Sequence, residues 1–163
     1  RENLSEDQFM IIRLGGFYGG GEELDKNFIG IFLNKILAKA IEDNVNTIEI
    51  GDRVWQPTWT FDIANVILFV LSKPWKSTYQ YACTDCVSFS ELAEMILSIL
   101  KLPQFEINKV SSSMIGDKAS RPQCIVMKSS KLLYDAKLVF PLRDRLEIYL
   151  HEQWKTYIKN IQI

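Results

Sequence analysis

Short apolar runs alternate with amphipathic segments along most of this chain, and the alternation limits the folds that are open to it. Four segments have the length and the apolar or alternating character of strands: 9–14, 47–50, 79–83 and 105–110. Four others repeat apolar residues at three- and four-residue spacing, as amphipathic helices do: 27–42, 61–72, 89–100 and 143–161. The two kinds of segment follow each other in turn, which predicts an α/β fold. Because no repeat or linker interrupts the pattern, we expect residues 1–163 to form a single unit.

Residues suited to helix starts support these boundaries. Ser88 and Glu91 have the three-residue spacing of a capping box, which predicts that a helix begins just after Ser88. Thr60 is expected to cap the helix over 61–72, and Ser130 is expected to cap a further short helix. Each cap would supply an acceptor for a backbone N–H that the first helical turn leaves unpaired.

Composition and charge exclude several classes of protein. The chain has 163 residues, 47% apolar and 12% aromatic, which suits one packed domain and argues against disorder. Its 19 Lys and Arg are balanced by 20 Asp and Glu, so no basic excess points to a nucleic-acid partner. The longest apolar stretch, 66–71, is far shorter than the roughly 20 residues that span a bilayer, so we expect no membrane partner.

The start of the chain and its cysteines bear on its origin. The chain begins at Arg1 without the apolar segment of a signal peptide, so it is either processed or part of a longer protein. An odd number of cysteines without such a signal predicts reduced thiols and a cytoplasmic location. Cys83 and Cys86 form a C-x-x-C pair, which suits either a redox or metal site or two small residues at a strand end. No metal site is expected, because only Cys124 and His151 remain as ligands, at no recognisable spacing.

The loop after the first strand is rich in glycine. Five of the eight glycines of the chain lie between residues 15 and 21. The loop lacks the lysine of a Walker loop and the glycine spacing of a dinucleotide fingerprint. These glycines either form a simple turn or allow the backbone to pass close to a ligand.

The chain offers no catalytic residue of the common kinds. Its single histidine, His151, lies inside the last predicted helix, and no G-x-S-x-G nucleophile elbow occurs. None of the six tyrosines is followed by lysine four residues later, so the Tyr-x-x-x-Lys dyad of short-chain dehydrogenases is absent. We therefore assign no catalytic residue to this chain.

Several segments, taken in order, resemble the extended short-chain dehydrogenases/reductases. Residues 11–19, I-I-R-L-G-G-F-Y-G, resemble their I-x-R-x-x-x-x-Y-G segment, and Asn27-Phe28 resembles an N-F pair at a helix start. Residues 57–64, P-T-W-T-F-D-I-A, resemble a segment most typical of the dTDP-4-dehydrorhamnose reductases. Residues 119–122, A-S-R-P, resemble a further segment of that group. Order and approximate spacing hold from about residue 9 to residue 159.

The resemblance covers only the C-terminal half of such an enzyme. It implies the C-terminal part of a Rossmann-like, doubly wound fold plus the small substrate-binding lobe. The N-terminal half, which in this family carries the G-x-x-G-x-x-G loop and the Tyr-x-x-x-Lys dyad, has no counterpart in this chain. The cofactor implied is NADP or NAD, bound mainly by that missing half.

The resemblance also implies site residues. It places Leu14, Gly15 and Gly16 near the nicotinamide, and Asn27, Thr58 and Arg121 toward a nucleotide sugar. The guanidinium group of an arginine can bind two oxygens of a diphosphate at once, which suits Arg121 to this role. The alternative is that Arg121 is an ordinary surface arginine. Asn27 is equally suited to cap a helix, and Thr58 to a place within a strand.

Two departures from the reductase pattern leave the sugar open. Arg53-Val54-Trp55 stands where the reductases usually have Gln-x-Gly, and Gly16 stands where they usually have tryptophan. Trp55 and Trp59 could each stack on a base or sugar or pack in the core.

The resemblance implies a substrate-binding portion of an NAD(P)H-dependent nucleotide-sugar reductase. The parent would reduce the C4 ketone of a dTDP-4-keto-6-deoxyhexose, as in dTDP-L-rhamnose synthesis, and could form a homodimer. This chain alone is expected to be inactive. The alternatives are an epimerase or dehydratase of the same superfamily, a non-catalytic regulatory subunit resembling that of methionine adenosyltransferase, and a freestanding binding module.

Overall fold

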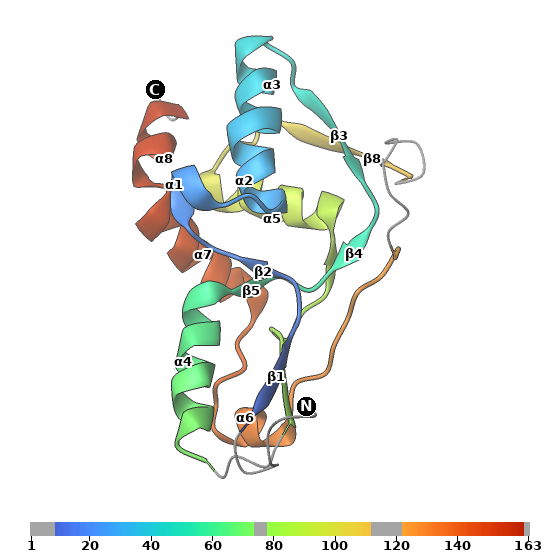
Figure 1. Cartoon of the computed structure of the whole chain (residues 1–163). Coiled ribbons are helices and arrows are strands. Elements are labelled where there is room, and N and C mark those ends of the chain that lie inside the picture. Colours follow the sequence, from blue (N-terminus) through green and yellow to red (C-terminus); the bar gives the residue numbers. More distant parts are fainter. Residues whose placement is uncertain (1–8, 74–77, 112–121, 162–163) are drawn as a thin grey trace.

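The alternation of strands and helices expected from the sequence is present in the computed structural model, which describes residues 9–73, 78–111 and 122–161 (Figure 1). The elements, in chain order, are β1 (Ile11–Leu14), β2 (Phe17–Tyr18), α1 (Gly21–Leu24), α2 (Phe28–Ile31), η2 (Phe32–Leu37), α3 (Ala38–Glu42), β3 (Thr47–Gly51), β4 (Val54–Trp55), β5 (Thr58–Trp59), α4 (Thr60–Leu71), β6 (Thr78–Tyr81), β7 (Val87–Ser88), α5 (Phe89–Leu100), β8 (Glu106–Val110), α6 (Lys131–Asp135), α7 (Leu142–Gln153) and α8 (Lys155–Ile161). The α/β class predicted from the sequence is confirmed.

The described strands associate in pairs, and most of the pairs are parallel. β1 pairs with β6, β2 with β5 and β3 with β8 in parallel, whereas β4 and β7 are antiparallel. In the first pair, Ile11 lies opposite Thr78 and Leu14 lies opposite Tyr81. Parallel strands need a long crossover, and α4 lies on the crossover into β6.

One hydrophobic core lies between the helices α2, η2, α3, α5, α7 and α8 and the strands β3 and β8 (Figure 1). Its largest fully buried side chains are Trp154, Tyr18, Tyr149, Phe32, Ile29, Leu33, Leu37, Leu92, Ile96 and Leu100. Burying a large apolar side chain stabilises a fold by roughly 1.5–3 kcal/mol. This core is therefore the main stabilising element of the helical part of the molecule.

A second, smaller core lies at the end of the molecule that holds α4, β1 and α6 (Figure 1). Its buried members are Ile63, Val66, Val70, Tyr79, Tyr81 and Leu133. Ile12 and Leu14 of β1 pack against it. The alternating residues of β1 and the inner face of α4 thus share one apolar layer.

A chain of hydrogen bonds joins the two cores where β1 bends into β2. The Gly15 amide donates to the Tyr81 carbonyl at 3.0 Å, and the Thr58 amide donates to the Gly16 carbonyl at 2.9 Å. Thr58 Oγ1 accepts from the Cys83 amide at 3.0 Å. We call this set the junction. It ties the ends of β1 and β6 to the pair β2–β5.

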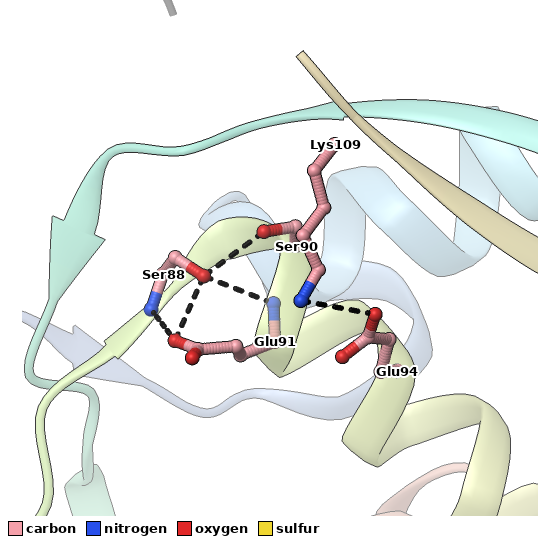
Figure 2. Close-up of polar contacts among 5 residues, drawn as sticks. All are labelled: Ser88, Ser90, Glu91, Glu94 and Lys109. Atoms are coloured by element: carbon pink, nitrogen blue, oxygen red, sulfur yellow. Dashed lines mark hydrogen bonds and ion pairs between the residues drawn. The ribbon is translucent and has the colours of Figure 1, made fainter. Parts of the chain in front are cut away.

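The capping box predicted at Ser88 is confirmed (Figure 2). The Glu91 amide donates to Ser88 Oγ at 3.1 Å, and the Ser88 amide donates to Glu91 Oε2 at 2.7 Å. These hydrogen bonds from Ser88 lower the pKa of Glu91. One turn further along, Glu94 Oε1 lies 3.3 Å from Lys109 Nζ of β8, an exposed ion pair that contributes little to stability.

The side chains of the two other predicted caps, Thr60 and Ser130, do not cap their helices. Thr60 is the first residue of α4 rather than its cap, and Trp59 takes the N-cap position without a side-chain hydrogen bond. Ser130 does precede α6, but its hydroxyl does not cap the helix. Ser130 Oγ instead accepts from the Gln80 amide at 2.9 Å, so this side chain satisfies the edge of β6.

The helix predicted over 27–42 is present but contains a π-type segment, η2. Its i→i+5 hydrogen bonding changes which side chains face the core, because it departs from the regular spacing of an α-helix. Leu33 in this segment is fully buried, whereas Ile41 near the end of α3 is exposed. The pattern located the helix but not its local geometry.

The helix predicted over 143–161 is interrupted at Trp154. The backbone there has φ −122° and ψ 25°, which ends α7 before α8 begins. The Trp154 ring is fully buried and meets Tyr157 edge-to-face, with ring centroids 5.6 Å apart.

None of the helices in the described part of the chain is long and apolar enough to cross a membrane.

A buried ion pair connects α4 to α7. Asp62 is only 2% exposed, and its Oδ2 lies 3.1 Å from Arg145 Nε. The Arg145 guanidinium also lies 3.5 Å above the centre of the Phe140 ring. Burial raises the pKa of Asp62 from an ordinary 3.8 to about 6, and the opposing effect of Arg145 is smaller.

The raised pKa of Asp62 predicts that part of the stability falls with rising pH. Because the folded state binds this proton more tightly than the unfolded state, the contribution is complete below pH 3.8 and is lost as the pH rises through about 6. Over that interval it amounts to about 3 kcal/mol. We expect the free energy of unfolding of the wild type, relative to Asp62→Asn, to decrease by most of this amount between pH 4 and pH 7 in chemical denaturation. Parallel pH profiles would contradict it.

Candidate functional site

A cavity opens between the β1–β2 bend and the start of α2. Its volume is about 510 Å³, within the range of small-molecule sites. The lining combines backbone, polar and aromatic groups: Gly15, Gly16, Lys26, Asn27, Arg53, Phe17, Phe28, Trp55 and Phe89. We call it the site cavity.

Three of the predicted site residues meet in this cavity. Gly15 and Gly16 form the bend at one side, and Asn27 lies at the start of α2 on the other. A side chain at Gly15 would press against Ala82, since a Cβ built there lies 3.1 Å from the Ala82 Cβ. The glycine bend is therefore a close-packed wall as well as a turn.

Asn27 occupies the N-cap position of α2, but its side chain does not cap the helix. Its backbone amide donates instead to Asp25 Oδ1 at 3.0 Å, and its carbonyl accepts from the Ile31 amide at 2.9 Å. Asp25 is itself held by Tyr149, whose hydroxyl donates to Oδ2 at 2.7 Å. The backbone of Asn27 is thus fixed, and its side-chain amide makes no hydrogen bond with the described residues.

Two of the other predicted residues, Leu14 and Thr58, do not line the cavity. Thr58 is buried, and its hydroxyl belongs to the junction. The side chain of Leu14 packs against the smaller core. Arg121 lies outside the described residues, so its predicted contact with the substrate stays a prediction.

Two cations in the lining were not predicted from the sequence. Lys26 adjoins Asn27, and its Nζ donates to the Glu23 carbonyl at 2.8 Å. Arg53 enters from the segment before β4. Since no carboxylate belongs to the described lining, the cavity favours an anionic ligand.

An aromatic wall forms one side of the cavity. The Phe28 and Phe89 rings stack with centroids 4.4 Å apart and planes 3° apart. Trp55 meets Phe89 edge-to-face, with centroids 5.9 Å apart. The three rings come from α2, α5 and β4, which are distant in the sequence. The sequence singled out Phe28, as part of the N-F pair, and Trp55, but not Phe89.

The two departures from the reductase pattern, at Gly16 and Trp55, are neighbours in space. A Cβ built at Gly16 would lie only 1.6 Å from Trp55 Nε1. The indole therefore occupies the space that any side chain at position 16 would need. A glycine and a tryptophan that are 39 positions apart form one feature of the cavity.

A buried amide behind the cavity holds its outer rim. Gln56 Nε2 donates to the Cys83 carbonyl at 2.7 Å, and Gln56 Oε1 accepts from the Met127 amide at 2.7 Å. The neighbouring segment is also tied to β4, because the Ile125 amide donates to the Val54 carbonyl at 3.3 Å. These contacts bring Ile125 to the cavity lining.

The C-x-x-C pair does not have the surroundings of a redox site. Cys83 is buried, and its burial raises the pKa of the thiol to about 12, so the thiolate is disfavoured. Cys86 and Cys124 are exposed free thiols. Within the described ranges, no group of three or more His, Cys, Asp or Glu residues could hold a metal ion.

Gln56 gives a test of how the cavity is held together. Gln56→Leu leaves the Cys83 carbonyl and the Met127 amide without their partner, so we expect the free energy of unfolding to fall by about 2–4 kcal/mol. Gln123→Leu removes an exposed amide that donates to Asp52, and should change stability by less than about 1 kcal/mol. Equal losses for the two variants in urea denaturation would contradict this account.

Comparison with known proteins places this fold in a family. Residues 2–153 match the sequence profile described as the RmlD substrate binding domain. No protein with a curated description matches the chain in sequence.

Solved structures share the fold. The dTDP-4-dehydrorhamnose reductase from Yersinia enterocolitica is 26% identical, with a TM-score of 0.73, over 88% of this chain and 49% of its own. The dTDP-4-dehydrorhamnose reductase from Bacillus anthracis, in complex with NADP, is 21% identical, with a TM-score of 0.70, over 89% of this chain and 49% of its own.

A UDP-N-acetylglucosamine 4-epimerase from Methanobrevibacter ruminantium, in complex with UDP-N-acetylmuramic acid, also shares the fold. It is 17% identical, with a TM-score of 0.62, over 93% of this chain and 46% of its own. This chain therefore spans about half the length of the solved structures that it matches.

Proposed function

Since the chain belongs to the RmlD substrate-binding domain family of nucleotide-sugar reductases, we propose that it is the substrate-binding portion of an NAD(P)H-dependent reductase acting on a nucleotide sugar. The observation that carries the proposal is the site cavity, whose lining combines two cations, the aromatic wall and an asparagine whose side-chain amide makes no hydrogen bond with the described residues. The reaction proposed for the complete enzyme is reduction of the C4 ketone of a dTDP-4-keto-6-deoxyhexose.

The polar side of the cavity suits a diphosphate. Lys26 offers a compact charge, and Arg53 offers a planar fork that can bind two oxygens at once. Asn27 can both donate to and accept from a hydroxyl group of the ligand. A few polar groups on an otherwise apolar lining is the usual composition of a site that orients a small molecule.

The described residues do not form a complete dinucleotide site. The space beside Gly15 is taken by Ala82, and the space beside Gly16 is taken by Trp55, so neither glycine leaves an open cradle for a diphosphate. In the proposed reaction NADPH or NADH supplies a hydride to the C4 carbon. The part played by this chain is to bind and orient the sugar nucleotide and to form one wall beside the ketone.

The surface of the smaller core supports the proposal that a dinucleotide-binding portion packs on this chain. In the described structure β1 pairs only with β6, whereas parallel sheets ordinarily have more strands and covered faces. On α4, the apolar side chains Phe61, Leu68 and Leu71 are 56%, 68% and 47% exposed. We propose that such a portion extends the sheet beside β1 and covers this face, and that any homodimer forms through the complete protein.

Binding of dTDP-glucose to the chain tests the proposed function. We expect saturable binding in isothermal titration calorimetry, weakened by added salt because the charges of Lys26 and Arg53 contribute. Lys26→Ala should weaken binding by about 2–5-fold, in line with loss of one exposed charge–charge contact. Lys39→Ala, on the exposed part of α3 and outside the cavity lining, is the matched control and should bind as the wild type does.

Two binding results and one activity result would contradict the proposed function. A wild-type chain that does not bind dTDP-glucose, or an equal effect of Lys26→Ala and Lys39→Ala, would contradict the proposal. The chain alone should not oxidise NADPH in the presence of a dTDP-4-keto-6-deoxyhexose, because it has no Tyr-x-x-x-Lys dyad. Oxidation by this chain alone would show that the assignment of roles is wrong.

A further inference from the structure

The two tryptophans singled out in the sequence have different surroundings. Trp59 is 4% exposed and packs against Phe61 and Tyr149, with ring centroids 5.1 and 6.1 Å away. Trp55 is only half-buried and lines the site cavity. Of these two indoles, only that of Trp55 is placed to meet a ligand.

Trp55 is held between two neighbours that fix the plane of its ring. Phe89 meets it edge-to-face at 76°, and Phe89 is itself stacked on Phe28. On the other side the indole lies against the Gly16 backbone, where a Cβ would be 1.6 Å from Nε1 and 2.6 Å from Cε2. A ring held in this way loses little conformational freedom when a ligand stacks on it.

The glycine at position 16 is explained by space rather than by backbone conformation. Gly19, Gly20 and Gly21 have positive φ angles, which favour glycine in their own right, whereas Gly16 does not. What excludes a side chain at position 16 is the indole of Trp55. Gly16 and Trp55 therefore act as one unit, in which the first residue makes room for the second.

The polar groups of the cavity and the indole suit different parts of one ligand. Lys26 and Arg53 suit a charged group, while an indole face suits a neutral ring with an apolar surface. A pyranose has such a surface, because its axial C–H groups gather on one face. A nucleobase is the other ring of a nucleotide sugar that could stack there.

Building on the function proposed above, we propose that Trp55 is the specificity-determining residue that stacks on the sugar ring of the ligand, and that Gly16 is the positioning residue that admits its indole. The sugar, rather than the base, is assigned to Trp55 because the indole lies over the glycine bend at the β1–β2 end of the cavity. The proposed hydride transfer takes place at the sugar, so the selective contact belongs with that ring.

The test compares the affinities of dTDP and dTDP-glucose for the chain, since their ratio reports the contribution of the sugar. The wild type should bind dTDP-glucose more tightly than dTDP. Trp55→Ala should lower that ratio by about 5–10-fold and leave the affinity for dTDP unchanged, as expected for loss of an aromatic stacking contact. Trp55→Phe keeps an aromatic face and should retain most of the ratio. It is the control that separates loss of stacking from unfolding of the Trp55→Ala variant.

Gly16 provides the second part of the test. Gly16→Ala should displace the indole and lower the ratio in the wild-type background. The same substitution in a Trp55→Ala background should change the ratio by less than about twofold, because the clash has been removed. A purely structural role for Gly16 would instead give the same effect in both backgrounds.

Each remaining outcome decides the question. If Trp55→Ala weakens dTDP and dTDP-glucose equally, the indole stacks on the base or supports the fold, and the inference is overturned. An unchanged ratio also overturns it. A wild-type chain that binds neither ligand overturns the proposed function itself, and the inference falls with it.

Discussion

The structure depends on the junction at the β1–β2 bend, where hydrogen bonds between backbone groups and one threonine join two hydrophobic cores. Gly15 donates to Tyr81 at the end of the pair β1–β6, and Thr58 connects Gly16 to Cys83. Because Thr58, Tyr81 and Cys83 are buried, breaking these hydrogen bonds would leave a donor or acceptor unpaired away from water. The junction thus fixes how the helical core and the strand end of the molecule lie relative to each other.

The site cavity follows from this constraint. The same bend that carries the junction also presents Gly16 to the cavity, and β4 carries Trp55 against it. On the opposite side, α2 begins at Asn27, whose backbone is held by Asp25. Thr58, predicted as a substrate contact, serves the site indirectly, since it holds the wall rather than lining it. A binding surface at the seam of two cores is a common way for a small lobe to hold a ligand.

The sequence predicted features that arise from local chemistry and missed those that arise from distant packing. Ser88 and Glu91 lie three residues apart, so their capping box and the start of α5 could be read directly. The stack of Phe28 on Phe89 joins residues 61 positions apart, and no local pattern encodes it. The contact of Trp55 with the glycine bend is of the same kind. The resemblance to the reductases supplied Asn27 and the two glycines at the cavity, whereas the cations beside them became visible only in three dimensions.

Nuclear magnetic resonance of the ¹⁵N-labelled chain during titration with dTDP-glucose tests the central claim most directly, because it locates the ligand. The account predicts that the largest shift changes occur at the Gly16 and Asn27 amides and at the Trp55 indole N–H, which all border one cavity. A different open cavity is bordered by residues 20–24 and by Glu152, Gln153, Lys155 and Thr156. Changes confined to those residues, with none at Gly16, Asn27 and Trp55, would contradict the account.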